Sequence, residues 1–191
     1  MIFSCLNGHG SRRLGSHPAY FIWVFGFATS SLGCSVEPAA NSIRAPGGSV
    51  LPSWVFATPD GKAYSSDQAL GRVTIVLFVT TYDTASQIAA TRFNSEIHSL
   101  PRRVNALAVA LEPPNHSVLV GVFHDSLRLT YPLLMPDPAT LAGHGPFGVI
   151  DVVPTWVVLD KSGQEIWRQS GVGAIPELRA TLLRVGAGAE K

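Results

Sequence analysis

The strongest pattern in the chain is an apolar run that is followed at once by a helical repeat. Residues 73–79 (Val-Thr-Ile-Val-Leu-Phe-Val) are almost continuously apolar, which is typical of a strand buried on both faces of a sheet. Residues 85–97 carry apolar side chains at positions 85, 88, 89, 93 and 97, the spacing of an amphipathic helix. Asp83 precedes this helix and suits the capping of its first N–H groups. We therefore predict a central strand that leads directly into a helix, at the strand end where α/β proteins commonly place their chemistry.

The other predicted elements alternate in type along the chain. Residues 104–111 form a second apolar strand, and residues 116–129 have apolar side chains at helical spacing. We predict shorter strands at 54–58, 131–135, 155–159 and 164–169, helical turns at 65–71 and 138–144, and a closing helix at 176–185. This order favours an α/β protein, a three-layer α/β/α sandwich with a mixed central sheet.

The N-terminal segment follows neither pattern. Arginines at 12 and 13 precede a short apolar stretch, residues 19–28, and residues 31–34 (Ser-Leu-Gly-Cys) resemble the box at which bacterial lipoproteins are cleaved and lipidated. We predict a signal peptide over residues 1–34, lipidation of Cys34, and attachment to a membrane of the bacterial cell envelope through the lipid, facing the periplasm. Simple secretion and an uncleaved N-terminal anchor are the alternatives, although the apolar stretch is shorter than the roughly 20 residues that span a bilayer.

Composition divides the rest of the chain into three segments and excludes several kinds of functional site. Residues 35–50 are rich in Pro, Gly, Ser and Ala and predict a flexible tether, residues 51–187 a folded domain, and residues 188–191 a tail. The net charge of +1 gives no electrostatic footprint for nucleic acid. The two cysteines are Cys5 and Cys34, so the domain contains no disulfide and no cysteine-based metal site.

Two blocks of sequence resemble a known protein family. Residues 51–62 (Leu-Pro-Ser-Trp-Val-Phe-Ala-Thr-Pro-Asp-Gly-Lys) and residues 147–163, which include Val153-Pro154-Thr155, resemble the thioredoxin-like superfamily, and more specifically extracytoplasmic redoxin and TlpA-type thiol-disulfide proteins. The resemblance covers residues 51–187 and implies a thioredoxin-like fold. It also implies a cis peptide bond before Pro154, beside the active-site turn.

The same resemblance exposes a departure at that turn. The family has an aromatic residue followed by Cys-x-x-Cys, whereas here Tyr82 matches the aromatic residue, Asp83 the first Cys and Ser86 the second. Disulfide exchange needs an attacking thiolate and a resolving thiol, so these substitutions imply a redox-inactive protein that acts by binding. The expected contact patch is Tyr82, Asp83, Val153 and Pro154. The implied partner is an extended peptide, without cofactor, metal or catalytic residue.

Three alternatives stay open. A working thiol-disulfide oxidoreductase would have to use Cys34 or a thiol from a partner. A non-thiol enzyme or metal binder would use Asp83 with Glu112, which ends the second buried strand and can face the same end of the sheet. Ser86 would be a nucleophile only with a base beside it.

Several further side chains have simpler interpretations. The histidines at 98, 116, 124 and 144 are scattered, and we interpret them as surface or capping residues. The tryptophans at 54, 156 and 167 are interpreted as packing residues. Thr80, Thr81 and Tyr82 form a hydroxyl-rich rim that would suit a ligand.

Overall fold

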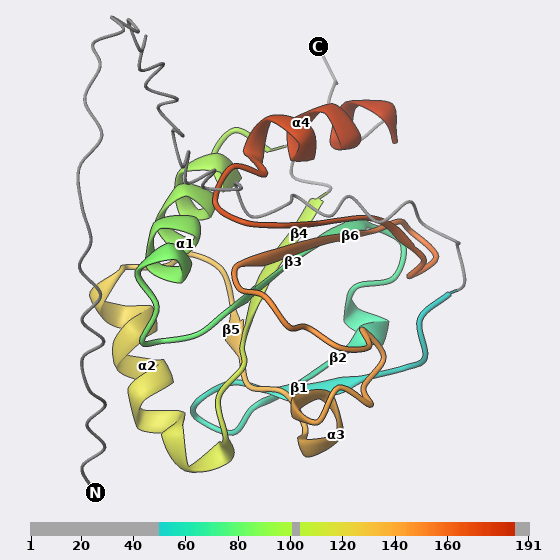
Figure 1. The fold of residues 1–191 in the computed structure, drawn as a ribbon. Helices are drawn as coiled ribbons and strands as arrows, with labels where there is room; N and C mark the ends of the chain where they lie inside the picture. Colours follow the sequence, from blue (N-terminus) through green and yellow to red (C-terminus); the bar gives the residue numbers. More distant parts are fainter. Residues whose placement is uncertain (1–49, 101–103, 186–191) are drawn as a thin grey trace, which may run out of the picture. The chain divides into compact units, whose positions relative to one another are not determined.

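The computed structural model describes residues 50–100 and 104–185 (Figure 1). The predicted signal peptide, residues 35–49 of the tether, the C-terminal tail and both cysteines therefore lie outside the described residues. Val50, the last residue assigned to the tether, pairs with Gln164 as an isolated bridge. None of the helices in the two described ranges is both long enough and apolar enough to cross a membrane.

A mixed sheet of five strands forms the centre of the described domain. β3 (Val73–Val79) lies in the middle, between its parallel neighbour β4 (Val104–Ala110) and its antiparallel neighbour β6 (Thr155–Leu159). β5 (Leu133–Leu134) pairs in parallel with β4, and β7 (Glu165–Ser170) pairs antiparallel with β6, so these two strands form the edges. The predicted mixed sheet is confirmed, as is the edge position of the strand around residues 164–169.

Helices and a hairpin cover the two faces of this sheet. α1 (Thr84–Ile97), α2 (Ser117–Ser126) and α4 (Ile175–Arg184) pack apolar side chains against one face. The other face is covered by the hairpin of β1 (Val55–Ala57) and β2 (Ala63–Ser65) together with Phe147. The connections contain the short helices η1 (Ser66–Gln68), η2 (Pro114–His116) and α3 (Pro138–Leu141). The predicted α/β class, with a mixed sheet flanked by helices, is confirmed.

The continuous apolar pattern of β3 follows from its central position. All seven of its residues are buried, and alternate side chains enter opposite cores. Leu77 packs in the core beneath the helices, and Phe78 packs in the core beneath the hairpin. The three tryptophans that sequence reasoning assigned to packing, residues 54, 156 and 167, are all buried in these cores, so that interpretation is confirmed.

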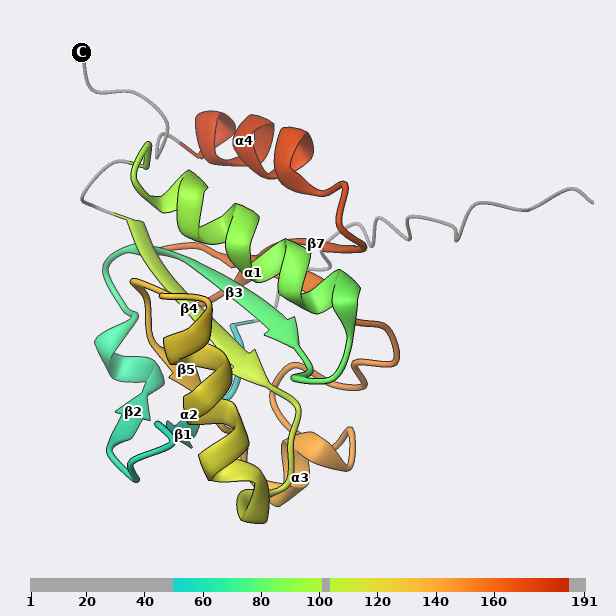
Figure 2. The same cartoon turned by 90° about the vertical axis from the view of Figure 1, so that its left-hand side faces the viewer.

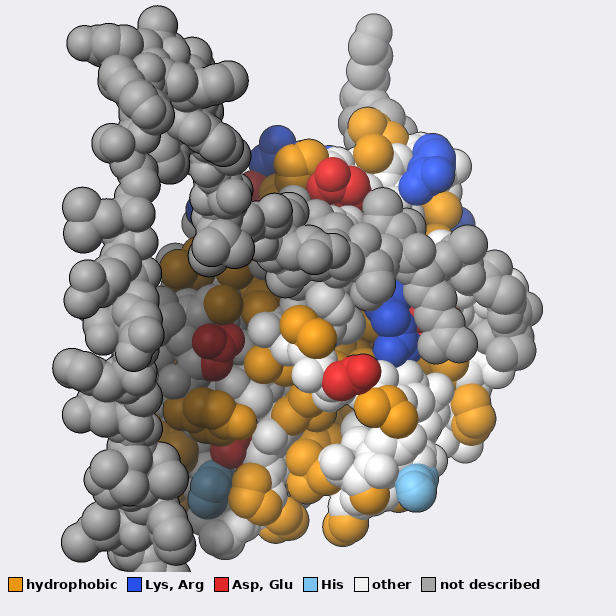
Figure 3. Space-filling model, viewed as in Figure 1, with side chains coloured by type: hydrophobic (Ala, Val, Ile, Leu, Met, Phe, Trp, Pro, Cys, Tyr) orange, Lys and Arg blue, Asp and Glu red, His pale blue; other side chains and the backbone are white. Residues whose placement is uncertain are grey.

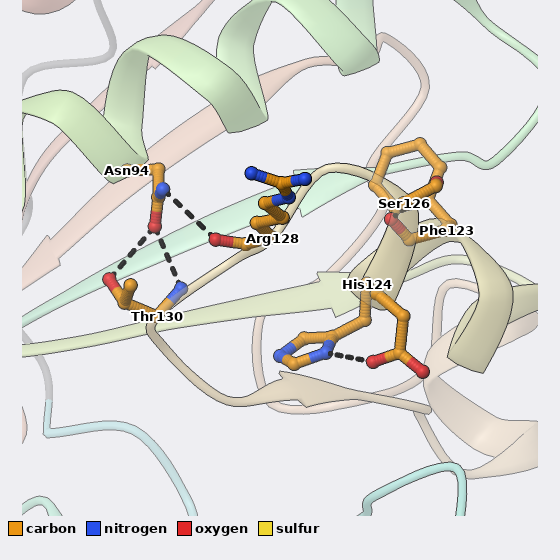
Figure 4. Close-up of polar contacts among 7 residues, drawn as sticks. Asn94, Phe123, His124, Ser126, Arg128 and Thr130 are labelled. Carbon is orange, nitrogen blue, oxygen red and sulfur yellow. Dashed lines mark hydrogen bonds and ion pairs between the residues drawn. The ribbon is translucent and has the colours of Figure 1, made fainter.

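α2 is shorter than the apolar spacing over residues 116–129 indicated. It ends at Ser126, and Arg128 two residues later has a positive φ of 50°, which ordinary side chains adopt rarely. Asn94, on α1, stabilises this turn: its amide donates to the Arg128 carbonyl (3.2 Å), and its carbonyl oxygen accepts from the Thr130 N–H (2.7 Å) and hydroxyl (2.8 Å) (Figure 4). The end of the helix is therefore fixed by a residue distant in sequence, which local periodicity could not reveal.

Candidate functional site

The connection from β3 to α1 lies at the carboxyl end of the parallel strands. β3 and β4 are in register, with Val79 opposite Ala110, so the residues that follow the two strands come together. The Leu111 N–H extends this pairing by donating to the Val79 carbonyl at 2.8 Å. Figure 2 shows the ends of both strands, the first turn of α1 and the short helix α3 at this same end of the sheet. This is the end at which we expected the candidate site from the sequence.

Asp83 caps α1, as predicted. Its carboxylate accepts hydrogen bonds from the Ser86 N–H (2.8 Å) and the Ala85 N–H (3.2 Å), and its backbone is extended (φ −105°, ψ 127°). Burial alone would raise the pKa of this carboxyl, but the Ser86 N–H, the Ser86 hydroxyl and the Ala85 N–H outweigh burial and lower the pKa. At Asp83, which the sequence resemblance matches to the family's first cysteine, the chain therefore has a charged helix cap.

Ser86, which the resemblance matches to the family's second cysteine, lies in the protein interior. Its side chain is fully buried, and its hydroxyl oxygen accepts a hydrogen bond from the Thr80 N–H at 3.2 Å. A substrate cannot reach a fully buried hydroxyl, which argues against the alternative in which Ser86 is a nucleophile. Ser86 instead ties the first turn of α1 to the end of β3.

Glu112 is buried beneath the connection between β3 and α1 and holds it in place. It is 2% exposed and accepts hydrogen bonds from the Thr81 N–H (2.9 Å) and the Thr81 hydroxyl (2.7 Å), while its second oxygen lies 2.9 Å from Nδ1 of His116. Burial would raise the pKa of Glu112, but the Thr81 N–H, His116 and the Thr81 hydroxyl together lower it. This buried carboxylate therefore joins the connection to the start of α2.

The arrangement bears on two interpretations of the sequence. Asp83 and Glu112 bind different donors, and no hydrogen bond or ion pair within residues 50–100 and 104–185 links a shared group to both. His116, expected to be a surface or capping residue, is 43% exposed at the start of α2 and also pairs with the buried Glu112. The part of the chain that the structure describes contains no cluster of three or more residues able to hold a metal ion.

An open groove of about 350 Å³ lies beside the first turn of α1. One wall comes from the residues that follow β3 and β4, and the other from α3 and the loop that leads to β6. Tyr82 projects from the first wall and is 79% exposed, and Val149 on the second wall is 66% exposed. The groove is lined by Thr80, Tyr82, Leu111, Thr140, Leu141, Ala142, Gly143, Val149, Ile150, Asp151 and Val153.

The predicted contact patch divides between this groove and the structure beneath it. Tyr82 and Val153 line the groove, whereas Asp83 caps α1 and Pro154 is buried behind a cis peptide bond with Val153. The second wall, formed by residues 140–151, was not expected from the sequence, because this segment has no regular apolar period. Figure 3 shows hydrophobic side chains interspersed with single acidic ones on the face of the molecule between α1 and α3.

The rim hydroxyls that sequence reasoning singled out lie at this site in different roles. Thr81 is buried and bound to Glu112, as described above. Thr80 lines the groove, is 5% exposed, and has a side-chain hydroxyl without a hydrogen-bond partner among the described residues. The hydroxyl of Thr140 on the opposite wall also lacks such a partner. Both oxygens are buried beneath the walls, so neither lies on the open surface of the groove.

Comparisons with known proteins identify the fold and leave the activity undetermined. No protein-family profile matches the chain, and no curated protein sequence matches it significantly. Many solved structures are similar, however. Peroxidoxin BcpB from Mycobacterium tuberculosis is 15% identical with a TM-score of 0.60, over 74% of this chain and 97% of that protein.

Two further structures are similar over two thirds or more of the chain. A DsbF homologue from Corynebacterium diphtheriae is 14% identical with a TM-score of 0.60, over 76% of this chain and 96% of that protein. StoA from Bacillus subtilis is 22% identical with a TM-score of 0.51, over 67% of this chain and 96% of that protein. At these identities the similarity shows the fold alone. The described domain therefore has the thioredoxin-like fold that its sequence resembles.

Proposed function

We propose that this chain is a thioredoxin-fold binding protein without dithiol chemistry, which holds an extended polypeptide segment in the groove beside Tyr82. The observation that carries the proposal is the groove itself, open and about 350 Å³ in volume, with the Tyr82 ring 79% exposed on one wall. Aromatic side chains that are exposed at this level are enriched where proteins bind partners.

The two positions that match the family's cysteines support this reading. Asp83 uses both of its carboxylate oxygens to cap α1, and Ser86 is fully buried against the Thr80 N–H. Neither side chain can form or exchange a disulfide, since both reactions need sulfur. The turn between β3 and α1 lies where the family has its active site, and in this chain its residues stabilise the helix.

The backbone around Val153 favours an extended segment as the occupant. Val153 is half-buried and lines the groove, and neither its N–H nor its C=O makes a hydrogen bond with another residue of the described ranges. Half-buried backbone groups are usually paired, and an extended peptide supplies the complementary donors and acceptors by adding as a strand. The exposed apolar side chains of Tyr82 and Val149 then contact alternate residues of that segment.

Binding of an unfolded polypeptide that has no thiols tests the proposal. The probe is the insulin B chain with both cysteines blocked by carbamidomethylation, titrated into the isotope-labelled full chain and followed by amide NMR shifts. We expect the largest shifts at residues 80–82 and 149–153, and we expect Tyr82→Ala to weaken binding. Leu119→Ala is the matched control, since Leu119 is 47% exposed on α2 and outside the groove. Shifts confined to other surfaces, or an unchanged affinity in Tyr82→Ala, would contradict the proposal.

We also propose that the domain acts in the bacterial cell envelope, attached through Cys34 and facing the periplasm. This proposal rests on the sequence of residues 12–34 alone, with residues 35–49 as the tether. Mass spectrometry of the N-terminus of the mature protein tests it. A diacylglycerol adduct on Cys34 supports the anchor and removes the sulfur that the oxidoreductase alternative needs, whereas an unmodified Cys34 or an intact residue 1 overturns the anchor.

A further inference from the structure

We infer that the groove selects a polypeptide segment that presents a lysine or arginine side chain to Asp151 and Tyr82. The inference rests on the proposed function, because it names the chemistry of the segment that the groove would hold.

Among the described residues that line the groove, the charged side chain is acidic. Asp151 lines it and is exposed, whereas Asp83 follows Tyr82 in the chain and caps α1. Of the described residues that line the groove, none is a lysine or an arginine. No ion pair recorded within the described ranges includes Asp83 or Asp151. A cation that enters the groove therefore meets carboxylate charge that the described part of the chain does not neutralise.

Two charged groups next to these walls, Arg168 and Glu112, are already engaged. Arg168, on β7, donates to the Phe147 carbonyl at 2.8 Å and forms an ion pair with Glu165 at 2.6 Å, with its side chain only 12% exposed. Glu112 is buried beneath Thr81 and paired with His116, so its charge acts on the groove only through space. Asp151 is therefore the carboxylate that a ligand in the groove can reach.

The shape of the groove suits a long basic side chain. Leu141 and Val149 give the second wall an apolar surface, against which the methylene stem of lysine or arginine can lie. The exposed Tyr82 ring offers an aromatic face to the charged end, where a cation–π contact adds to the attraction of the Asp151 carboxylate. Both features are specific to a cationic side chain with an apolar stem.

The charge of Asp151 also disfavours the other two classes of segment. A purely apolar segment would leave Asp151 unpaired, and an acidic segment would be repelled by its carboxylate.

Three blocked heptapeptides test the inference. They share the sequence acetyl-Gly-Val-Thr-X-Thr-Val-Gly-amide, with X as lysine, norleucine or glutamate, and each is titrated into the labelled full chain at low and high salt. We expect the lysine peptide to bind about three- to tenfold more tightly than the norleucine peptide, as one exposed charge contact with a cation–π contact would give. The glutamate peptide should bind more weakly than both. High salt should reduce the preference for lysine.

A charge-neutralising substitution and its control locate the effect. Asp151→Asn should lower the affinity for the lysine peptide about threefold or more and leave the norleucine peptide unchanged. Asp125→Asn should change neither, because Asp125 is 85% exposed on α2 and does not line the groove. Equal binding of the lysine and norleucine peptides, with shifts at residues 80–82 and 149–153, overturns the inference and supports the proposed function. Shifts confined to other surfaces for every peptide count against both.

Discussion

The helix cap at Asp83 gives a prediction whose size follows from the structure. Asp83→Ala removes two hydrogen bonds, those from the Ala85 and Ser86 N–H groups, and leaves both donors to water. Loss of such a cap destabilises a protein by about 1 kcal/mol, with a usual range of about 0.5–2 kcal/mol. For a domain of this size that corresponds to a fall in Tm of about 3–5 °C. Asp83→Asn keeps one acceptor oxygen, so it should retain one of the two hydrogen bonds. It should lose the other, together with the interaction of the charge with the helix dipole, which is worth about 0.3–1 kcal/mol.

The pH dependence gives the same prediction a second test. The pKa of Asp83 is lowered in the folded protein, so the charged carboxylate stabilises the fold above its unfolded pKa of about 3.9, and this contribution is lost as the pH falls through the folded pKa. The difference in unfolding free energy between the wild type and Asp83→Ala should therefore shrink on acidification from pH 7.

Urea unfolding followed by circular dichroism measures both effects. Asp125→Ala serves as the control, and its stability should stay within about 0.5 kcal/mol of the wild type because Asp125 is 85% exposed. If Asp83→Ala is as stable as the wild type at pH 7, or if its deficit is unchanged at low pH, then the reasoning that assigns Asp83 to capping is refuted.

Two further substitutions test the walls of the groove. Glu112→Ala leaves the buried Thr81 N–H and hydroxyl without their acceptor, so urea unfolding should show a loss of about 2–3 kcal/mol, and a loss under 0.5 kcal/mol would contradict the anchoring role. Gly145→Ala would place a Cβ 2.1 Å from the Thr140 hydroxyl, so the second wall must shift. The expected cost is about 1–3 kcal/mol together with weaker binding of the blocked B chain. Gly173→Ala, where nothing lies within 4 Å of the added Cβ, is the matched control, and equal behaviour of the two variants would refute the steric argument.

The local part of the site could be predicted from the sequence. Residues 73–79 are apolar throughout because β3 is buried on both faces, and Asp83 stands where the extended backbone changes to helix. Both signals lie within one short stretch of chain and depend on burial and capping alone. The same holds for the mixed sheet, since the order of strands and helices restricts how the strands can pair.

The other half of the site could not be predicted, because it depends on contacts between distant segments. Thr81 and Glu112 are 31 positions apart, and only the parallel register of β3 and β4 brings them together. The loop that carries Val149 and Asp151 has no apolar period, so nothing in its sequence places it across from Tyr82. His116 lies only four residues after Glu112, but the burial of that carboxylate depends on its contact with Thr81.

Reduction of insulin by dithiothreitol, followed as turbidity, tests the central claim most directly. The claim is that the turn between β3 and α1 has the position of an active site but carries no pair of thiols. The full chain should not accelerate the reaction beyond dithiothreitol alone. Asp83→Cys/Ser86→Cys should accelerate it, because residues three apart at the start of a helix lie within disulfide reach and the helix N-terminus favours a thiolate. Acceleration by the unaltered chain would contradict the account, and its loss in Cys34→Ser would assign the activity to that thiol.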